Sequence, residues 1–393
     1  MDRRELLHFG MATIAASALT KSALAQTPAA APAATTPTGS FPLDIWSKHL
    51  QWLRTPQEVV KALQDISLKS VDLTVLPAPG HVDPAKVATD LPAFVNGLKQ
   101  GGISVTCITT NIVDADTPNA EAILDAASKA GIKYYSWGGF KYDTTKPYAP
   151  QLDALKPRIQ KLSRLNQKYG MKALYQPARG PENIGSLFVD LLDVFKEFDP
   201  KFIAFRYDTG ALLQVTNDNF LTHVRLGGAY IGAVAINDAK VELELPTWNE
   251  GPFLGNPRQL LAPSGGGDNQ GNAGGNFDAI GGGGRPLPYR YRPLPVGTGM
   301  VDLTLLGKTL KDMNFSGPAE AQINWDLNGV EKGTDKITYP RQEIIGHLKR
   351  DRLIIEQAFR GPWNIDVALP AFMARQEGRA AAAPGRGGAG GDN

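Results

Sequence analysis

This chain of 393 residues has one cysteine, a small net charge and few long apolar runs. Its one cysteine, Cys107, cannot form an intramolecular disulfide. Because Cys107 lies in an apolar, strand-like run, we expect a buried structural thiol rather than a nucleophile. The formal net charge is only +2, which argues against a nucleic-acid surface or an anionic membrane face. The 42% of hydrophobic residues is ample for one large core.

The first 25 residues have the features of an export signal. Arg3 and Arg4 form a paired-arginine segment, Phe9–Leu19 is mildly apolar, and Ala23-Leu24-Ala25 offers a small-residue cleavage site. These features favour a twin-arginine (Tat) leader and a periplasmic protein; the alternative is a cytoplasmic amphipathic N-terminus. The apolar stretch is too short to cross a bilayer, and cleavage would remove it, so we expect no stable membrane span. Residues 26–40, rich in Ala, Pro and Thr, are typical of a linker.

An apolar run followed by a helix-like segment recurs along residues 41–361. Most of the runs start about 30 residues apart, the length of one strand–helix unit. Eight such units predict an α/β fold, a closed (β/α)8 TIM barrel, whose chemistry lies at the C-terminal ends of the strands. The eight runs are Leu43–Leu50, Val71–Leu76, Ile103–Thr109, Ile132–Trp137, Met171–Gln176, Phe202–Asp208, Ile231–Asp238 and Ala319–Trp325.

Two segments do not fit the repeating unit. Residues 241–299 form a long insertion after the seventh run, and its glycine-rich middle predicts partial disorder. Because the insertion leaves a strand end, it is either a lid over the catalytic face or an insertion without catalytic duty. Residues 362–393, rich in Gly and Arg, predict a disordered tail.

Polar residues gather where the predicted strands end. His49 closes the first run and His81 follows the second, so both are candidates for proton transfer, although a lone histidine in a strand is usually a bonded core residue. Asp208 and Asp238 end the sixth and seventh runs and could orient these groups. The candidate substrate-binding residues are Trp137, Gln176, Arg179, Arg206 and Asn324.

Several motifs together resemble one family. Ser47–Trp52, Val71–Val75, Pro79–Val82, Arg206–Asp208 and Gly297–Asp302 are similar to segments of the sugar phosphate isomerase/epimerase family, which belongs to the xylose isomerase-like TIM barrels. The resemblance covers residues 41–361 apart from the glycine-rich loop. It implies an enzyme of sugar metabolism, and a small-molecule sugar as partner. Self-association is left open.

The resemblance also implies a divalent metal, often Mn, held by an acid on strand 5, an Asp on strand 6 with a His three residues later, a His or acid on strand 7 and a Glu on strand 8. Here these positions read Gln176, Asp208 with Ala211, Asn237 with Asp238, and Asn324. Hard cations need anionic oxygens, so this depleted set would hold Mn or Mg loosely. The cofactor therefore stays unassigned.

Three functions remain to be weighed. The first is a sugar isomerase- or epimerase-like enzyme that moves a proton next to a carbonyl, with the related elimination or hydration of 3-keto-glycosides as a variant. The second is a catalytically degraded barrel that binds a sugar or a partner protein. The third, a DNA-repair endonuclease of the same superfamily, needs a dense metal cluster and a basic surface, which the composition does not offer.

Overall fold

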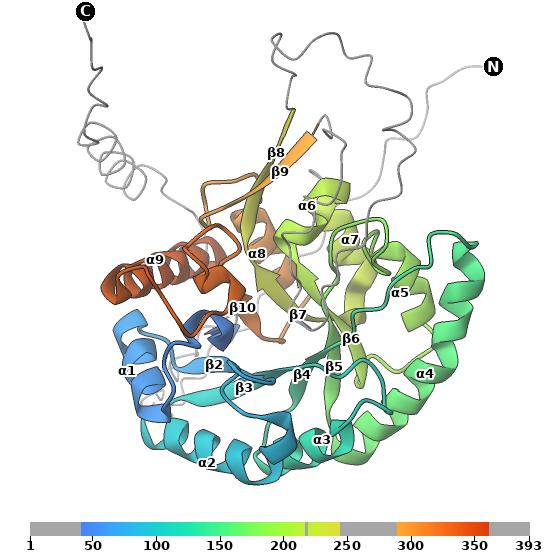
Figure 1. The fold of residues 1–393 in the computed structure, drawn as a ribbon. Coiled ribbons are helices and arrows are strands. Elements are labelled where there is room, and N and C mark those ends of the chain that lie inside the picture. The colour runs from blue at the N-terminus through green and yellow to red at the C-terminus, as the bar shows by residue number, and fades with distance from the viewer. Residues whose placement is uncertain (1–40, 217–218, 244–288, 361–393) are drawn as a thin grey trace, which may run out of the picture. The chain divides into compact units, whose positions relative to one another are not determined.

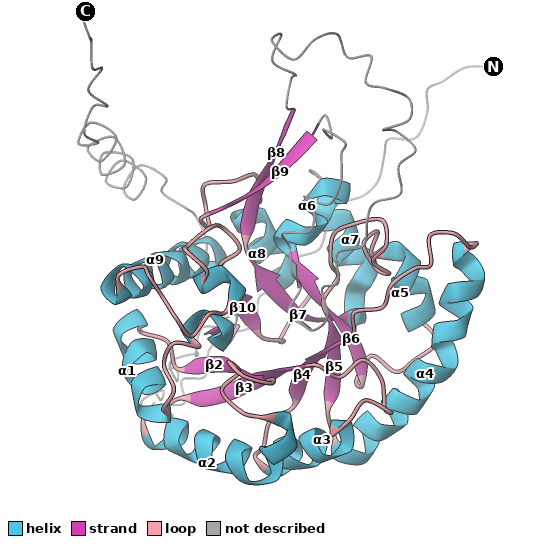
Figure 2. Cartoon of the chain, in the orientation of Figure 1, coloured by secondary structure: helices cyan, strands magenta, loops and turns pink. Residues whose placement is uncertain are grey.

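The computed structural model describes residues 41–216, 219–243 and 289–360, and these contain one barrel. Eight strands pair in the order β1-β10-β7-β6-β5-β4-β3-β2, all of them parallel. A bridge between Trp46 and Asp72 brings the β1 end of this sheet to β2, so the barrel is nearly closed. The helices surround it on the outside (Figures 1 and 2). The predicted (β/α)8 architecture is confirmed.

The barrel strands are short and alternate with helices along the chain. The strands are β1 (Leu43–Ile45), β2 (Ser70–Val75), β3 (Ser104–Thr110), β4 (Tyr134–Trp137), β5 (Lys172–Tyr175), β6 (Ile203–Asp208), β7 (Ile231–Ile236) and β10 (Ala319–Ala321). The helices are α1 (Pro56–Ile66), α2 (Val87–Gln100), α3 (Ala120–Lys129), α4 (Tyr148–Tyr169), α5 (Val189–Phe195), α6 (Thr209–Thr216), α7 (Phe220–Gly227), α8 (Leu303–Asp312) and α9 (Arg341–Arg360). Short 3-10 helices of the described residues lie between these elements: η1 (Ser47–Leu50), η2 (Pro84–Lys86), η4 (Gly228–Tyr230) and η6 (Val330–Lys332).

Local sequence signals set the helix ends. The Thr55 side chain accepts from the backbone of Glu58 while Glu58 reaches back to Thr55, and Pro56 fills the first helical position of α1. Gly170 ends α4 in the left-handed conformation at φ 63°. Both arrangements provide for backbone N–H or C=O groups that the end of a helix leaves unpaired.

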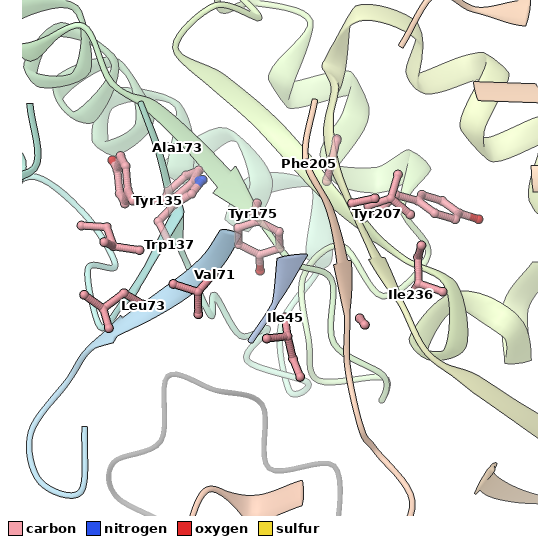
Figure 3. Close-up of a cluster of buried hydrophobic side chains, with 14 of the residues drawn as sticks. Ile45, Val71, Leu73, Tyr135, Trp137, Ala173, Tyr175, Phe205, Tyr207 and Ile236 are labelled. Carbon is pink, nitrogen blue, oxygen red and sulfur yellow. The ribbon is translucent and has the colours of Figure 1, made fainter. Parts of the chain in front are cut away.

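The strands are buried on both faces, as parallel sheets require. All six residues of β2, of β6 and of β7 are buried. Apolar residues that point outward pack against the helices, and Figure 3 shows part of this layer with Leu73, Trp137, Tyr175, Phe205 and Tyr207. The inward-pointing residues are more polar, and they carry the candidate site.

The main departures from the predicted elements occur at strand ends. The first apolar run is a strand only to Ile45 and continues as η1 (Ser47–Leu50), and the eighth run is a strand only to Ala321. After the sixth run, two short helices, α6 and α7, follow β6 where the repeating unit predicts one.

The described ends of the 241–299 insertion form a hairpin. Strands β8 (Asp238–Leu243) and β9 (Tyr289–Leu294) pair in antiparallel register as a separate two-stranded sheet. Residues 244–288, and with them the predicted glycine-rich disorder, lie outside the described residues. The predicted leader, linker and tail also lie outside them. No helix in the described part of the chain is long and apolar enough to cross a membrane.

Candidate functional site

Four polar side chains meet at the end of the barrel where the strands' C-termini lie, here called the barrel mouth. Asp208 is the last residue of β6, and the other three stand one position beyond their strands: Gln176 after β5, Asn237 after β7 and Gln322 after β10. The pairing of Ala321 with Ile236 places Gln322 and Asn237 at the same level. We call these four residues the mouth cluster.

Hydrogen bonds hold the mouth cluster together around one carboxylate. Gln176 Nε2 donates to Asp208 Oδ2 at 2.7 Å, and Asn237 Nδ2 donates to Asp208 Oδ1 at 2.9 Å. The backbone N–H of Ala211 donates to the same Oδ1 at 2.7 Å. Gln176 Nε2 also lies 3.1 Å from Gln322 Oε1. The carboxylate, which only accepts, fixes which end of the Gln176 and Asn237 amides faces it.

The electrostatics of the cluster leave Asp208 more basic than an exposed aspartate. Burial raises the pKa of Asp208, while the three N–H donors and the positive charge of Arg179 oppose that shift. One Oδ2 position remains for a further partner, because each carboxylate oxygen can accept about two hydrogen bonds. Asp208 is therefore a candidate base at the mouth.

The donor set of the mouth cluster does not fit a hard divalent cation. It offers one carboxylate and three neutral amides, and Gln176 and Asn237 direct their N–H groups at that carboxylate. Mn and Mg prefer anionic oxygens, which an acid at Gln176 or Gln322 would have supplied. Within the described ranges, no group of three or more His, Cys, Asp or Glu side chains could hold a metal ion.

Arg179 and Tyr291 lie next to the cluster. The Arg179 guanidinium stands over the Tyr291 ring, 3.5 Å from its centroid. Burial raises the pKa of Tyr291, and the charges of Asp208 and Asp238 act in the same direction, while Arg179 opposes them. The phenol therefore stays protonated at neutral pH and can donate a hydrogen bond.

Arg206 lies one layer below the mouth, inside the barrel. Its Nη2 is 2.6 Å from Asp72 Oδ2 and its Nη1 is 3.1 Å from Glu320 Oε1. Nη2 also lies 2.7 Å from Cys107 Sγ. Arg206 is 2% exposed, so its charge is already used within the barrel and we do not include it among the proposed substrate contacts.

His49 is fully buried in η1 and bonds the main chain through both ring nitrogens. Nε2 accepts from the backbone N–H of Ile323 at 3.0 Å, and Nδ1 lies 3.4 Å from the Val330 carbonyl oxygen. Burial, followed by the charge of Lys48, lowers the pKa of His49 to about 3. The ring therefore ties η1 to the segment after β10, and both nitrogens are engaged.

His81 follows β2, where its Nδ1 lies 2.8 Å from Thr74 Oγ1 and 3.3 Å from Ser47 Oγ. Its ring packs edge-on against Phe94 of α2. Burial, with a contribution from the charge of Arg54, lowers the pKa of His81 to about 4. No hydrogen bond among the described residues joins His81 to the mouth cluster.

Asp238 anchors the hairpin. Its carboxylate accepts from the backbone N–H groups of Ala239 at 2.8 Å, Gly297 at 3.0 Å, Gly299 at 2.8 Å and Val301 at 3.1 Å. These bonds join the start of β8 to the segment after β9. The structure thus gives Asp238 a structural task beside the mouth.

Two further candidates lie apart from the cluster. Trp137 is 4% exposed and packs against Phe140, Tyr175 and Phe195, on the outward face of β4 (Figure 3). Asn324 is partly exposed, two residues beyond Gln322. Gln176, Asp208 and Arg179 are the predicted residues that the structure brings together.

Gln322 and Tyr291 are the residues that sequence reasoning missed. The alternation of Glu320 and Gln322 on the inward face could have pointed to Gln322, because residues two apart in a strand share a face. No comparable signal identifies Tyr291, since its position depends on the pairing of β9 with β8 across residues 244–288.

The chain belongs to a family of TIM barrels. Residues 57–339 match the family described as "Xylose isomerase-like TIM barrel". Comparison with curated proteins gives no significant match.

Solved structures with the same fold include several enzymes. D-psicose 3-epimerase from Clostridium cellulolyticum H10 aligns with a TM-score of 0.54 and 11% identity over 81% of this chain and 99% of its own. 3-Keto-D-glucoside 4-epimerase from E. coli aligns with a TM-score of 0.51 and 13% identity over 80% and 100%. A probable 3-DHS dehydratase from Bacillus anthracis aligns with a TM-score of 0.52 and 10% identity over 80% and 98%. At these identities the likeness shows the fold.

Proposed function

We propose that the protein is a sugar isomerase- or epimerase-like enzyme that moves a proton at a carbon next to the carbonyl of a sugar or keto-sugar. The observation that carries this proposal is the buried Asp208 carboxylate, fixed by three N–H donors at the barrel mouth. Asp208 takes the proton, the C–H electron pair forms a carbon–carbon double bond, and the carbonyl oxygen takes the negative charge. Asp208 gives the isomer when it returns the proton to the former carbonyl carbon while the neighbouring hydroxyl proton moves to the former carbonyl oxygen. A proton that water delivers to the opposite face of the original carbon gives the epimer, and Asp208 then releases its own proton to water.

In this proposal a protein side chain supplies the positive charge that stabilises the substrate oxygen. Arg179 is the cation whose charge reaches Asp208, so it can face a developing oxyanion in the same site. Gln176, Asn237 and Gln322 present amides suited to sugar hydroxyls. The proposal therefore assigns no divalent metal to the mouth cluster.

Two other functions have support of their own. A dehydratase shares the fold, so the same proton removal could be followed by loss of a hydroxyl, as in a keto-glycoside lyase or hydratase. A sugar-binding barrel without catalysis is favoured by the three hydrogen bonds that Asp208 already accepts, because they stabilise the carboxylate and weaken it as a base.

Deuterium exchange separates these functions. The protein is incubated in D2O with D-psicose, D-tagatose, D-fructose, a 3-keto-D-glucoside or 3-DHS, and NMR follows exchange next to the carbonyl together with any epimer, isomer or elimination product. We expect exchange with at least one of these, and a loss of about 10²-fold or more in Asp208→Asn. Asp351→Asn is the matched control, since Asp351 is an equally buried carboxyl on α9. Calorimetric binding without any exchange would favour the binding protein.

Metal analysis tests the metal-free part of the proposal. Treatment with EDTA should leave the exchange rate unchanged, and added Mn should not raise it. The variant Gln176→Glu/Asn237→His/Gln322→Glu supplies three of the ligand types that the resemblance implies, beside Asp208, so it should bind Mn in equilibrium dialysis where the parent protein does not. Stoichiometric Mn in the parent protein would contradict this part of the proposal.

We also propose export through the paired arginines of the leader. Replacing Arg3 and Arg4 by lysine should retain the protein in the cytoplasmic fraction, because Tat leaders are read through these arginines. Equal periplasmic amounts of variant and parent would refute a Tat route.

A further inference from the structure

The β8–β9 hairpin brings a side chain to the mouth that the sequence places far from every barrel strand. The hairpin starts directly after Asn237 and pairs Tyr291 with Val241. Figure 1 shows it projecting from the barrel beside α6, and α6 contacts β8. The hairpin is therefore an extension of a strand that already contributes to the mouth cluster.

The base of this hairpin is fixed. Asp238 holds the backbone N–H groups of Gly297, Gly299 and Val301, and the Met300 N–H donates to the Ala239 carbonyl at 2.8 Å. A Cβ on Gly299 would lie only 2.2 Å from Asp238 Oδ1, so the backbone approaches the carboxylate closely. These contacts tie the hairpin that carries Tyr291 to the barrel at its base.

Gly210 shows where the Tyr291 hydroxyl lies. A Cβ on Gly210 would stand 1.9 Å from Asn237 Oδ1 and 3.0 Å from Tyr291 Oη. The hydroxyl and the amide oxygen therefore gather over the same glycine, at the start of α6. Asn237 is 1% exposed, and its Oδ1 has no hydrogen-bond partner among the described residues.

A buried acceptor without a partner costs free energy unless a ligand or water satisfies it. Tyr291 Oη can donate a hydrogen bond, and Asn237 Oδ1 can accept one. A ligand with a hydroxyl group next to a carbonyl group could bond to both. The Arg179 guanidinium over the ring adds a positive charge on the same side.

We propose that Tyr291 is a catalytic residue whose hydroxyl donates a hydrogen bond to the substrate carbonyl oxygen, while Asn237 Oδ1 accepts from the neighbouring hydroxyl. This inference rests on the proposed function and supplies its electrophile. As Asp208 takes the proton from carbon, the carbonyl oxygen becomes an enolate oxygen. The Tyr291 hydroxyl and the Arg179 charge stabilise that oxygen, and the phenol keeps its own proton.

Two variants test the inference by different routes. Tyr291→Phe removes the hydroxyl and keeps the ring under Arg179. Gly210→Ala changes neither Tyr291 nor Asn237 chemically, but its methyl group would lie 1.9 Å from Asn237 Oδ1 and 3.0 Å from Tyr291 Oη, so the Asn237 amide must move away from the hydroxyl. Tyr230→Phe is the matched control, because it removes a hydroxyl bonded to the Phe198 carbonyl, just before β7 at the opposite end of the barrel. Thermal unfolding of every variant reports folding.

The expected result is a fall of about 10²-fold in the exchange rate for both test variants, in kcat as well as kcat/KM, with KM little changed. The control should keep the parent rate. A rise in KM with an unchanged kcat would show binding alone and would overturn the catalytic role. An unchanged rate in Tyr291→Phe would also overturn it, while the proposed function would stand on Asp208→Asn.

If the parent protein exchanges no deuterium with any probe, the proposed function fails. Calorimetry of sugar binding then tests whether the Tyr291 hydroxyl contacts the ligand. A loss of about tenfold in affinity for a bound sugar in Tyr291→Phe, with Tyr230→Phe unchanged, would support the hydrogen bond. Unchanged affinity would refute it, and so would the absence of binding by every probe.

Discussion

Replacing Arg206 by methionine should leave a buried negative charge without a counter-ion inside the barrel. Arg206 is 2% exposed, and its guanidinium contacts Asp72 at 2.6 Å and Glu320 at 3.1 Å. Methionine keeps a similar length and apolar volume, so the variant removes mainly charge and hydrogen bonds. Without Arg206, both carboxyls lose the cation that they contact, and Asp72 loses the shorter of the two contacts.

The expected cost is large for one substitution. Breaking a buried ion pair by removing one partner costs about 3–5 kcal/mol, because the other charge stays buried and uncompensated. A domain is stable by only about 5–15 kcal/mol, so the variant should lose about a fifth or more of that free energy. For a barrel of this size the fall in Tm is on the order of 10 °C.

Urea unfolding followed by tryptophan fluorescence measures this cost. The control is Arg206→Met/Asp72→Asn, which also removes the carboxylate at Asp72. At least half of the lost free energy of unfolding should return in this double variant. Protonation of a carboxylate without a counter-ion abolishes its charge. The loss of unfolding free energy in the single variant should therefore be smaller at pH 5 than at pH 7.5. A deficit below about 1 kcal/mol, or no recovery in the double variant, would refute an ionic barrel interior.

Three other measurements follow from buried groups. Burial lowers the pKa of His49 to about 3, so its contribution to stability is full above the unfolded value near 6.5 and falls at lower pH. The protein should lose about 2 kcal/mol between pH 7.5 and pH 5 from this group, and His49→Gln should flatten the pH profile; a profile unchanged by the substitution would contradict this. Burial raises the pKa of Cys107 well above its usual range, so a thiol reagent should react only after unfolding, and reaction of the native protein would disprove a closed barrel interior. Asp238→Asn should speed hydrogen exchange at residues 297–301, because an amide cannot accept from all four N–H groups; unchanged exchange would show that the hairpin base holds without Asp238.

The fold was predictable because eight units repeat one pattern, but apolarity marks burial rather than strands. Leu50 is fully buried, yet it lies in the 3-10 helix η1. Ile323 is 1% exposed beyond the end of β10, and it accounts for the apparent length of the eighth run. Both segments fold inward after their strands have ended.

The same effect explains which site residues were missed. Counting the eighth strand to Trp325 selected Asn324, whereas β10 ends at Ala321 and presents Gln322. Gln176 and Asp208 were found because their runs end close to their strands. Tyr291 depends on a pairing between distant segments, which periodicity along the chain does not encode.

The distribution of charge links the fold to the chemistry proposed for it. Inside the barrel, Arg206 neutralises buried carboxyls one layer below the mouth, while the mouth cluster carries a single carboxylate among amides. A cation bound there would have to displace the N–H groups that hold Asp208, with no second anion to stabilise it. Enolate formation nevertheless needs positive charge near the substrate oxygen. Arg179, stacked on Tyr291, is a cation that the structure places at this cluster. We therefore expect the hairpin that carries Tyr291 to supply the electrophile of this barrel.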